Sequence, residues 1–242
     1  MNLHLAIALG AVLAGFVQGF SGFAFGLVAM SIWAWTLEPT LAGPLVVLCS
    51  LAGQFMQMRM DNLQHTNPIA WRYIVGGLPA VPLGVLTLQW MDPRVFKLGV
   101  GALLIVVASL SLLWRDLFRL KQARSRLDYL VGLVGGFLGG VCGLVGALPS
   151  WWSSHKPIER AENRQALQVF FTAVHIVTIA FYGLRGLITL PTLGYAALAF
   201  AAMYLPARAG ARLYHRLDAA TAQRAILGVL LVVGVTLLAV NR

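Results

Sequence analysis

The feature that most constrains the fold is a series of long segments almost without charge. No Asp, Glu, Lys or Arg occurs from Met1 to Leu37, and further runs with few charges follow at Leu41–Met58, Ile69–Trp90, Val95–Trp114, Tyr129–Trp152, Ala166–Leu184, Leu187–Leu205 and Ala225–Val240. A helix of about 20 residues, rising about 1.5 Å per residue, crosses a hydrocarbon core about 30 Å thick. The sequence therefore predicts an all-α integral membrane protein with several spans.

The composition supports a membrane rather than a soluble fold. Of 242 residues, 59% are hydrophobic and 11% charged, which leaves too little polar surface for a soluble globule. The runs do not alternate as β-barrel strands do, and the N-terminal run lacks the basic start and A-x-A-like site of a cleaved signal peptide. The net charge of +10 lies in the connections between runs. We therefore expect the partner of these charges to be the lipid bilayer and not nucleic acid.

The chain contains an internal duplication. "GFVQGFSG" at Gly15–Gly22 matches "GFLGGVCG" at Gly136–Gly143 after a shift of 121 positions. Later, "LPAVPLGVL" from Leu78 resembles "LPARAGARL" from Leu205. We expect two repeats, residues 1–114 and 127–242.

The linker between the repeats, residues 115–126, carries five basic residues and is predicted to be cytoplasmic by the positive-inside rule. The other basic connections can also be cytoplasmic only if Leu3–Leu37 and Leu127–Trp152 each enter the membrane and return to the side from which they entered. Both segments carry glycine-rich breaks, at Gly19–Gly22 and Gly139–Gly143. This predicts two inverted repeats, each a broken helical hairpin plus three transmembrane helices, with both termini outside. Such an arrangement is typical of secondary transporters.

The two breaks are predicted to meet near the membrane centre and bind an anion. A helix that restarts after Gly22 would present unpaired N–H groups and a positive dipole end. The candidate substrate-binding residues are the small or polar ones at the breaks and inside the runs: Gln18, Ser21, Gly22, Gln54, Cys142, Gly143, Arg164 and His175.

Several of these candidates have a structural alternative. Ser21 and Cys142 either face the substrate or allow close helix packing. Arg164 either holds the anion with its planar fork or snorkels to the interface. His175 either binds an anion or relays a proton, or it is a neutral ring bonded to a neighbouring helix. Gln54 either lines the path or joins helices, and joining helices is the role expected of Gln57, which lies near the membrane edge.

The acidic residues all fall at span ends or in connections, so no carboxylate is expected in mid-membrane. This argues against a cation carrier. The sequence has no CxxC, HExxH or P-loop pattern, and we expect neither a metal nor another cofactor. An intramembrane enzyme would need a nucleophile and base or a metal site, which one mid-membrane histidine does not supply.

Two stretches resemble the signatures of a known family. "GFVQGFSGFAFGLVAM" followed by "LEPTLAGPLVVL", and "GGFLGGVCGLVGALPSWW" followed by "RAENRQALQVFFTAVHIVTIAFYGLRGLIT", are similar to the two halves of the sulfite exporter TauE/SafE family. The resemblance covers nearly the whole chain. It implies a multi-pass protein of the bacterial inner membrane that exports small sulfur-containing or organic anions, such as sulfite or sulfoacetate.

Three points stay open beside this resemblance. The stretch from Gly143 to Ala147 replaces a denser glycine cluster of the commoner family pattern, which bears on the substrate. Alternating access is the expected mechanism, and an anion channel on the same inverted repeats is the alternative. A homodimer is one candidate for the oligomeric state.

Overall fold

The computed structural model describes residues 2–22, 24–61, 68–113, 125–214 and 219–240. Most of the basic linker, and the connections that contain His65 and His215, lie outside these residues. All regular structure within them is helical, in the order α1 (Leu3–Ser21), α2 (Phe25–Thr36), α3 (Pro39–Asp61), α4 (Pro68–Gly77), the 3-10 turn η1 (Leu78–Ala80), α5 (Val81–Trp90), α6 (Pro93–Leu113), α7 (Leu127–Cys142), α8 (Ala147–Ser154), α9 (Arg160–Leu184), α10 (Leu190–Tyr214) and α11 (Ala219–Val240).

Among the described residues, six helical segments are long and apolar enough to cross a membrane: Leu3–Ser21, Pro39–Gln57, Ile69–Trp90, Pro93–Leu112, Ala161–Leu184 and Leu190–Leu213. The predicted all-α membrane fold is confirmed, and the chain is a multi-pass membrane protein. The run Ile69–Trp90 is not one regular helix, because Pro79 and Pro82 each lack a backbone N–H and the helix tightens at η1 between α4 and α5.

Glycine ends α1 and α7 where the sequence predicts the breaks. Gly22 (φ 89°) and Gly143 (φ 71°) both adopt the left-handed conformation, which a residue without a β-carbon accepts readily. Their N–H groups donate back to Gln18 O at 2.7 Å and Gly139 O at 3.0 Å. Each helix therefore stops cleanly and lets the chain turn.

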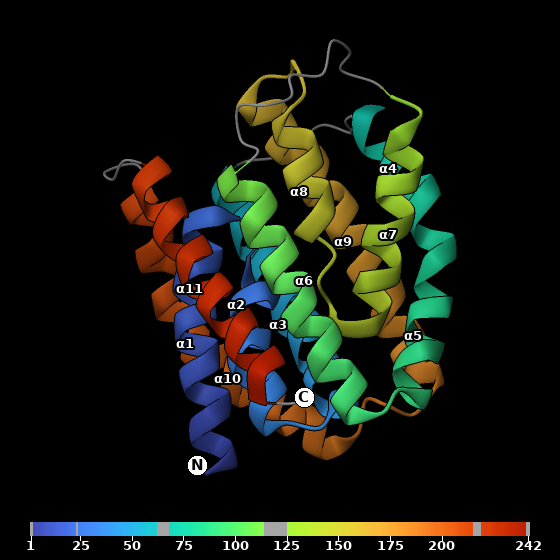
Figure 1. Cartoon of the computed structure of the whole chain (residues 1–242), viewed down its shortest axis with the longest axis vertical. Helices are drawn as coiled ribbons and strands as arrows, with labels where there is room; N and C mark the ends of the chain where they lie inside the picture. The colour runs from blue at the N-terminus through green and yellow to red at the C-terminus, as the bar shows by residue number, and fades with distance from the viewer. Residues whose placement is uncertain (1, 23, 62–67, 114–124, 215–218, 241–242) are drawn as a thin grey trace.

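The helices that precede the two breaks run in opposite directions. In Figure 1, α1 rises from the N-terminus at the lower end, whereas α7 descends from the upper end. The chain turns inside the molecule after α7, and α8 returns to the upper end. The end of α11 lies near the lower end, where α1 begins.

Glycines let these helices approach others closely. α1 packs along α10, and α7 packs along α4 and α5. A β-carbon on Gly19 would collide with the carbonyl of Ala207, and one on Gly140 would collide with the carbonyl of Val81. Small residues at such crossings are typical of helix packing in membranes, where van der Waals contact replaces the hydrophobic effect.

This packing predicts that Gly19→Ala destabilises the protein by about 1–3 kcal/mol or more, because the clash is with backbone and cannot be relieved by a side-chain rotation. Gly194 provides a matched control, since a β-carbon there meets nothing within 4 Å. Thermal unfolding of the two purified variants in detergent measures the difference. Equal melting temperatures for Gly19→Ala and Gly194→Ala would contradict the packing.

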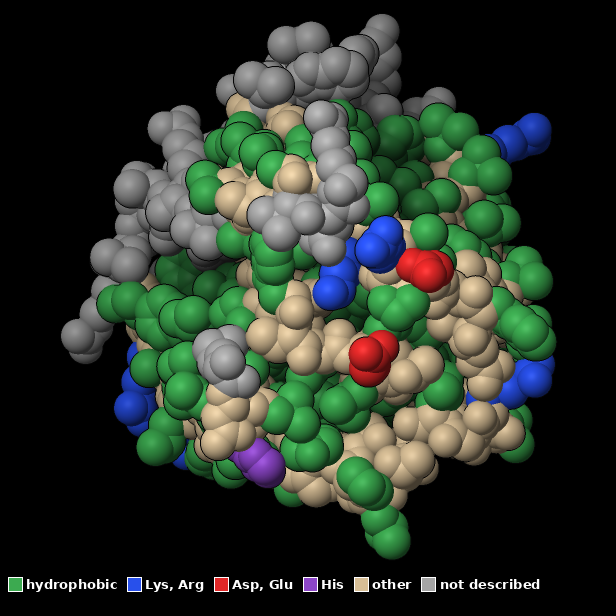
Figure 2. Space-filling view, turned by 60° about the horizontal axis from the view of Figure 1, so that its bottom comes forward, with side chains coloured by type: hydrophobic (Ala, Val, Ile, Leu, Met, Phe, Trp, Pro, Cys, Tyr) green, Lys and Arg blue, Asp and Glu red, His purple; other side chains and the backbone are tan. Residues whose placement is uncertain are grey.

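Large hydrophobic side chains are exposed along the helices, among them Trp71, Trp90, Leu184, Leu190 and Leu205. On the face shown in Figure 2, hydrophobic side chains are widespread and charged ones are few. An apolar surface of this extent is unfavourable in water and is compatible with contact to lipid tails.

Candidate functional site

Gln18 bridges the break between α1 and α2. Its buried side chain donates from Nε2 to Gly22 O at 3.3 Å and accepts the Phe25 N–H at Oε1 at 3.0 Å. The Phe25 N–H at the start of α2 is therefore paired, because an amide one turn before the break is long enough to reach it. Gln18 holds the break in shape.

Ser21 and Cys142 turn back onto their own helices. Ser21 Oγ donates to Val17 O at 2.8 Å and accepts the Ala24 N–H at 3.1 Å. Cys142 Sγ donates to Leu138 O at 3.4 Å, the same step of four residues. These contacts hold both side chains against the ends of their own helices.

A group of polar side chains from α3 and α9 closes around the first break. Gln57 donates from Nε2 to Gly19 O at 3.3 Å, and Gln168 donates from Nε2 to Gly22 O at 2.7 Å. A β-carbon placed on Gly22 would lie 3.3 Å from Gln168 Nε2, 3.4 Å from Gln57 Oε1 and 3.5 Å from Arg164 Nε. We call Gln18, Gly22, Gln57, Arg164 and Gln168 the Gly22 cluster.

A second group, the His175 cluster, lies at the other break and comprises Gln54, Gly143, Thr172 and His175. His175 Nδ1 lies 3.0 Å from Gln54 Nε2, and its Nε2 lies 3.4 Å from Gly143 O. Thr172 donates to Gln54 Oε1 at 3.4 Å. A neutral ring with its proton on Nε2 satisfies both contacts, so the geometry matches the alternative in which His175 bonds to a neighbouring helix.

The two clusters are adjacent because the two breaks touch. A β-carbon on Gly26, in the first turn of α2, would lie 3.1 Å from Gly143 O and 2.9 Å from Leu144 Cδ2. Both clusters also draw on the same two helices, since α3 packs against α9. The structure thus brings Gln18, Gly22, Gln54, Gly143, Arg164 and His175 into one region.

Two residues of this region, Gln168 and Thr172, were not predicted from the sequence, and Gln57 was expected only to join helices. Arg164, Gln168, Thr172 and His175 follow one another at i, i+4, i+8 and i+11, which places them on one face of α9. That spacing was a readable signal for Gln168 and Thr172. Gln57 does join α3 to α1, as expected, but its buried side chain also lies at the Gly22 break.

The region contains hydrogen-bond donors of the kind that suit an anion. Arg164 and the amide N–H groups are donors, and most neighbouring side chains are apolar. Within the described ranges, no group of three His, Cys, Asp or Glu side chains lies close enough to hold a metal ion.

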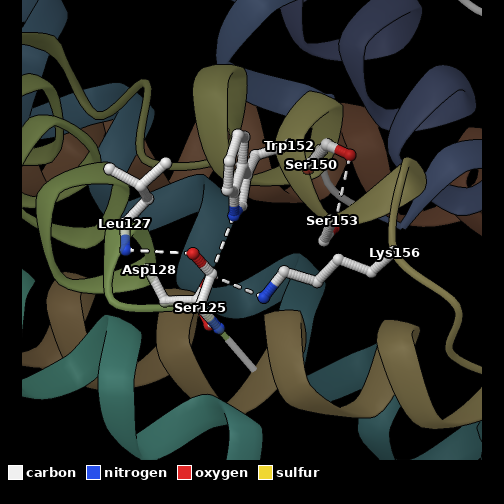
Figure 3. A network of polar contacts seen from close by, with 7 residues as sticks. All are labelled: Ser125, Leu127, Asp128, Ser150, Trp152, Ser153 and Lys156. Carbon is white, nitrogen blue, oxygen red and sulfur yellow. Dashed lines mark hydrogen bonds and ion pairs between the residues drawn. The ribbon is translucent and has the colours of Figure 1, made fainter. Parts of the chain in front are cut away.

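A separate buried ion pair joins the start of α7 to the segment just after α8 (Figure 3). Lys156 Nζ lies 2.5 Å from Asp128 Oδ1, and both side chains are fully buried. Asp128 also accepts the Trp152 Nε1–H at 2.8 Å and the Ser125 N–H at 3.0 Å. Lys156 lies over the Tyr73 ring of α4, 5.0 Å from its centroid.

The sequence places Asp128 only among acidic residues at span ends, and the structure shows it inside the protein. Burial lowers the pKa of Lys156 from its ordinary value, and the contact with Asp128 opposes that shift. We call Asp128 and Lys156, with their partners Ser125, Trp152 and Tyr73, the α7–α8 clasp.

Comparisons with known proteins match nearly the whole chain. A family model described as Sulfite exporter TauE/SafE matches residues 7–237. The chain is also similar to a protein of Cupriavidus necator named "Probable sulfite/organosulfonate exporter TauE". The two are 27% identical over 245 residues, which covers 98% of this chain and 93% of that protein.

Proposed function

The chain belongs to the sulfite exporter TauE/SafE family, and on that premise we propose that it exports small sulfur-containing or organic anions, such as sulfite or sulfoacetate, by alternating access. The family is described as a sulfite exporter, which supports a transporter rather than an enzyme. The similar Cupriavidus necator protein, whose name includes both sulfite and organosulfonates, supports this substrate class. We place the protein in the bacterial inner membrane.

One observation carries the proposal for the site: the Arg164 guanidinium lies beside Gly22, where two helix breaks meet inside an apolar protein. An irregular backbone at that depth is tolerated only where it is buried or lines a watery path. A guanidinium presents a planar fork of donors that matches the oxygens of a sulfonate or carboxylate. The buried amides of the Gly22 cluster hold the surrounding backbone in place.

The arrangement of the two halves supports inverted repeats. Gly22 and Gly143 are equivalent under the shift of 121 positions, and both have a positive φ. Gln54 and His175 are also 121 positions apart, and they hydrogen-bond to each other. Equivalent residues that touch each other are the mark of a two-fold relation. The axis of such a relation would pass between these two side chains.

The close helix crossings support the same relation and adjust its register. Gly19 on α1 meets Ala207 of α10, and its equivalent Gly140 on α7 meets Val81 of α5. These contacts pair Val81 with Ala207, whereas the sequence alignment from Leu78 and Leu205 pairs Val81 with Arg208. The contacts therefore favour an alignment in which the offset between the two repeats is one residue smaller in this part of the chain.

Uptake into liposomes that carry the purified protein tests the proposed substrate class. The panel consists of sulfite, sulfoacetate, taurine and simple carboxylates, with protein-free liposomes as the control. We expect saturable uptake of sulfur-containing anions. Uptake of none of these anions by a correctly folded protein would refute the proposal.

Counterflow separates alternating access from the channel alternative. Unlabelled anion loaded inside the liposomes accelerates the entry of labelled anion through a carrier, because the binding site must return to its outward-facing state in each cycle. A channel conducts continuously under a voltage and shows no such exchange. A conductance without saturable counterflow would establish the channel.

The basic linker predicts the orientation in the membrane. Cysteines introduced at Asn2 and Arg126, both exposed, should label differently in intact cells. An impermeant maleimide is expected to reach Asn2→Cys from outside, and Arg126→Cys only after the membrane is permeabilised. The native Cys49 and Cys142 are buried and contribute little background. Labelling of Arg126→Cys alone in intact cells would reverse the orientation.

A further inference from the structure

Two buried acceptor atoms in the Gly22 cluster lack a hydrogen-bond partner. They are the Oε1 atoms of Gln57 and Gln168, and their side chains belong to residues that are 5% and 1% exposed. Each amide donates its nitrogen to a carbonyl at the end of α1, Gly19 O or Gly22 O. Because a carbonyl oxygen can only accept, the amide orientations are fixed and the unpartnered atoms are acceptors.

One of these acceptors, Gln57 Oε1, lies near the cationic side chain of Arg164. Gln57 Oε1 and Arg164 Nε both lie within 3.5 Å of the position that a β-carbon on Gly22 would take, together with Gln168 Nε2. Arg164 presents only donors, and the two amide oxygens present only acceptors. Buried polar atoms are normally paired, so the pair of orphaned oxygens is itself an unusual feature. A ligand that complements the whole cluster needs an anionic group and a donor of its own.

We propose, resting on the proposed function, that the preferred substrate is a small anion that also carries an O–H or N–H group, and that Gln57 and Gln168 select it by accepting that hydrogen bond. A sulfonate with a hydroxyl or amino group at its far end belongs to this class, as does sulfite in its protonated form. Sulfoacetate with both acids ionised does not, and is a poorer substrate.

The physical basis is the cost of leaving buried acceptors unpaired. A site built to bond a hydroxyl or amino group rejects the analogue that lacks it, because the protein oxygens are then desolvated without compensation. An apolar contact alone discriminates far less between analogues of the same size. Transport efficiency should therefore differ at least about tenfold between matched anions with and without the donor.

Three sulfonates with one two-carbon skeleton test this in liposomes that carry the full chain: 2-hydroxyethanesulfonate, 2-aminoethanesulfonate and ethanesulfonate. We expect kcat/KM for one or both donor-bearing anions to exceed that for ethanesulfonate by at least about tenfold. Equal efficiency for all three overturns the inference and leaves the proposed function standing. If neither these sulfonates nor sulfite and sulfoacetate are transported, the proposed function fails as well.

Substitution of Gln57 and Gln168 tests whether their amide oxygens cause the preference for anions that carry a donor. Gln57→Met and Gln168→Met keep the length of the side chain and remove the acceptor, so the ratio between 2-hydroxyethanesulfonate and ethanesulfonate should fall toward one. Gln54→Met is the matched control, because Gln54 Oε1 already accepts from Thr172, and it should keep the ratio even if the overall rate falls. If Gln57→Met and Gln168→Met fold and the ratio between the two anions is unchanged, these glutamines do not select the substrate. If the variants do not fold, the ratio measured for the wild-type protein decides the inference.

Discussion

Replacing Arg164 by alanine is expected to reduce the efficiency of anion transport by about 100-fold, because truncating one partner of a desolvated charge contact costs about 2–5 kcal/mol. Arg164→Lys should retain part of the activity, since it keeps a positive charge but loses the planar fork that fits a sulfonate. The measurement is kcat/KM for sulfite in liposomes, at equal amounts of inserted protein.

The two variants together separate binding from a merely interfacial role. An arginine that only snorkels to the membrane interface can be replaced by lysine or alanine with little effect on transport. Near-normal transport in both variants would therefore remove Arg164 from the site. Gln165, the next residue, lies on a different face of α9 and serves as the control position through Gln165→Ala.

Breaking the α7–α8 clasp is expected to have the largest effect on stability. Asp128→Ala leaves the Lys156 ammonium group fully buried without its ion-pair partner. The loss of one partner of a buried pair destabilises a protein by about 3–5 kcal/mol. For a chain of this size we expect a decrease in melting temperature of about 10 °C, measured by thermal unfolding in detergent.

A double variant provides the control for that prediction. Asp128→Leu combined with Lys156→Met removes both charges, so no uncompensated charge remains in the interior. It should recover most of the stability that Asp128→Ala loses. If the single and double variants unfold at the same temperature, the destabilisation does not come from the unpaired charge.

The helices and their breaks could be predicted because both depend on local properties. A run without charges long enough to cross a bilayer has few alternatives to a helix, since every backbone group must be paired inside the segment. The breaks were visible because Gly22 and Gly143 stand where the chain needs a left-handed residue. The tightening at η1 was not predicted, although its prolines were visible in the sequence.

The candidate site could be predicted only in part. Arg164 and His175 stood out because charged or titratable side chains are costly inside a membrane. Gln18 was also singled out, but its role was not, because a sequence does not show that its amide reaches across to the Phe25 N–H. Gln168 was not singled out from the sequence, and it proved to be a partner of Gly22.

The membrane class, the approximate positions of the helices and the two breaks could thus be predicted from the sequence, since they follow from hydrogen bonds and hydropathy over a few turns of chain. Which side chains share a site depends instead on the tertiary structure. Gln168 meets Gly22 across 146 positions, and Lys156 meets Asp128 across 28. Such contacts depend on how each helix is rotated about its axis, and that rotation is set by the close packing of all its neighbours at once.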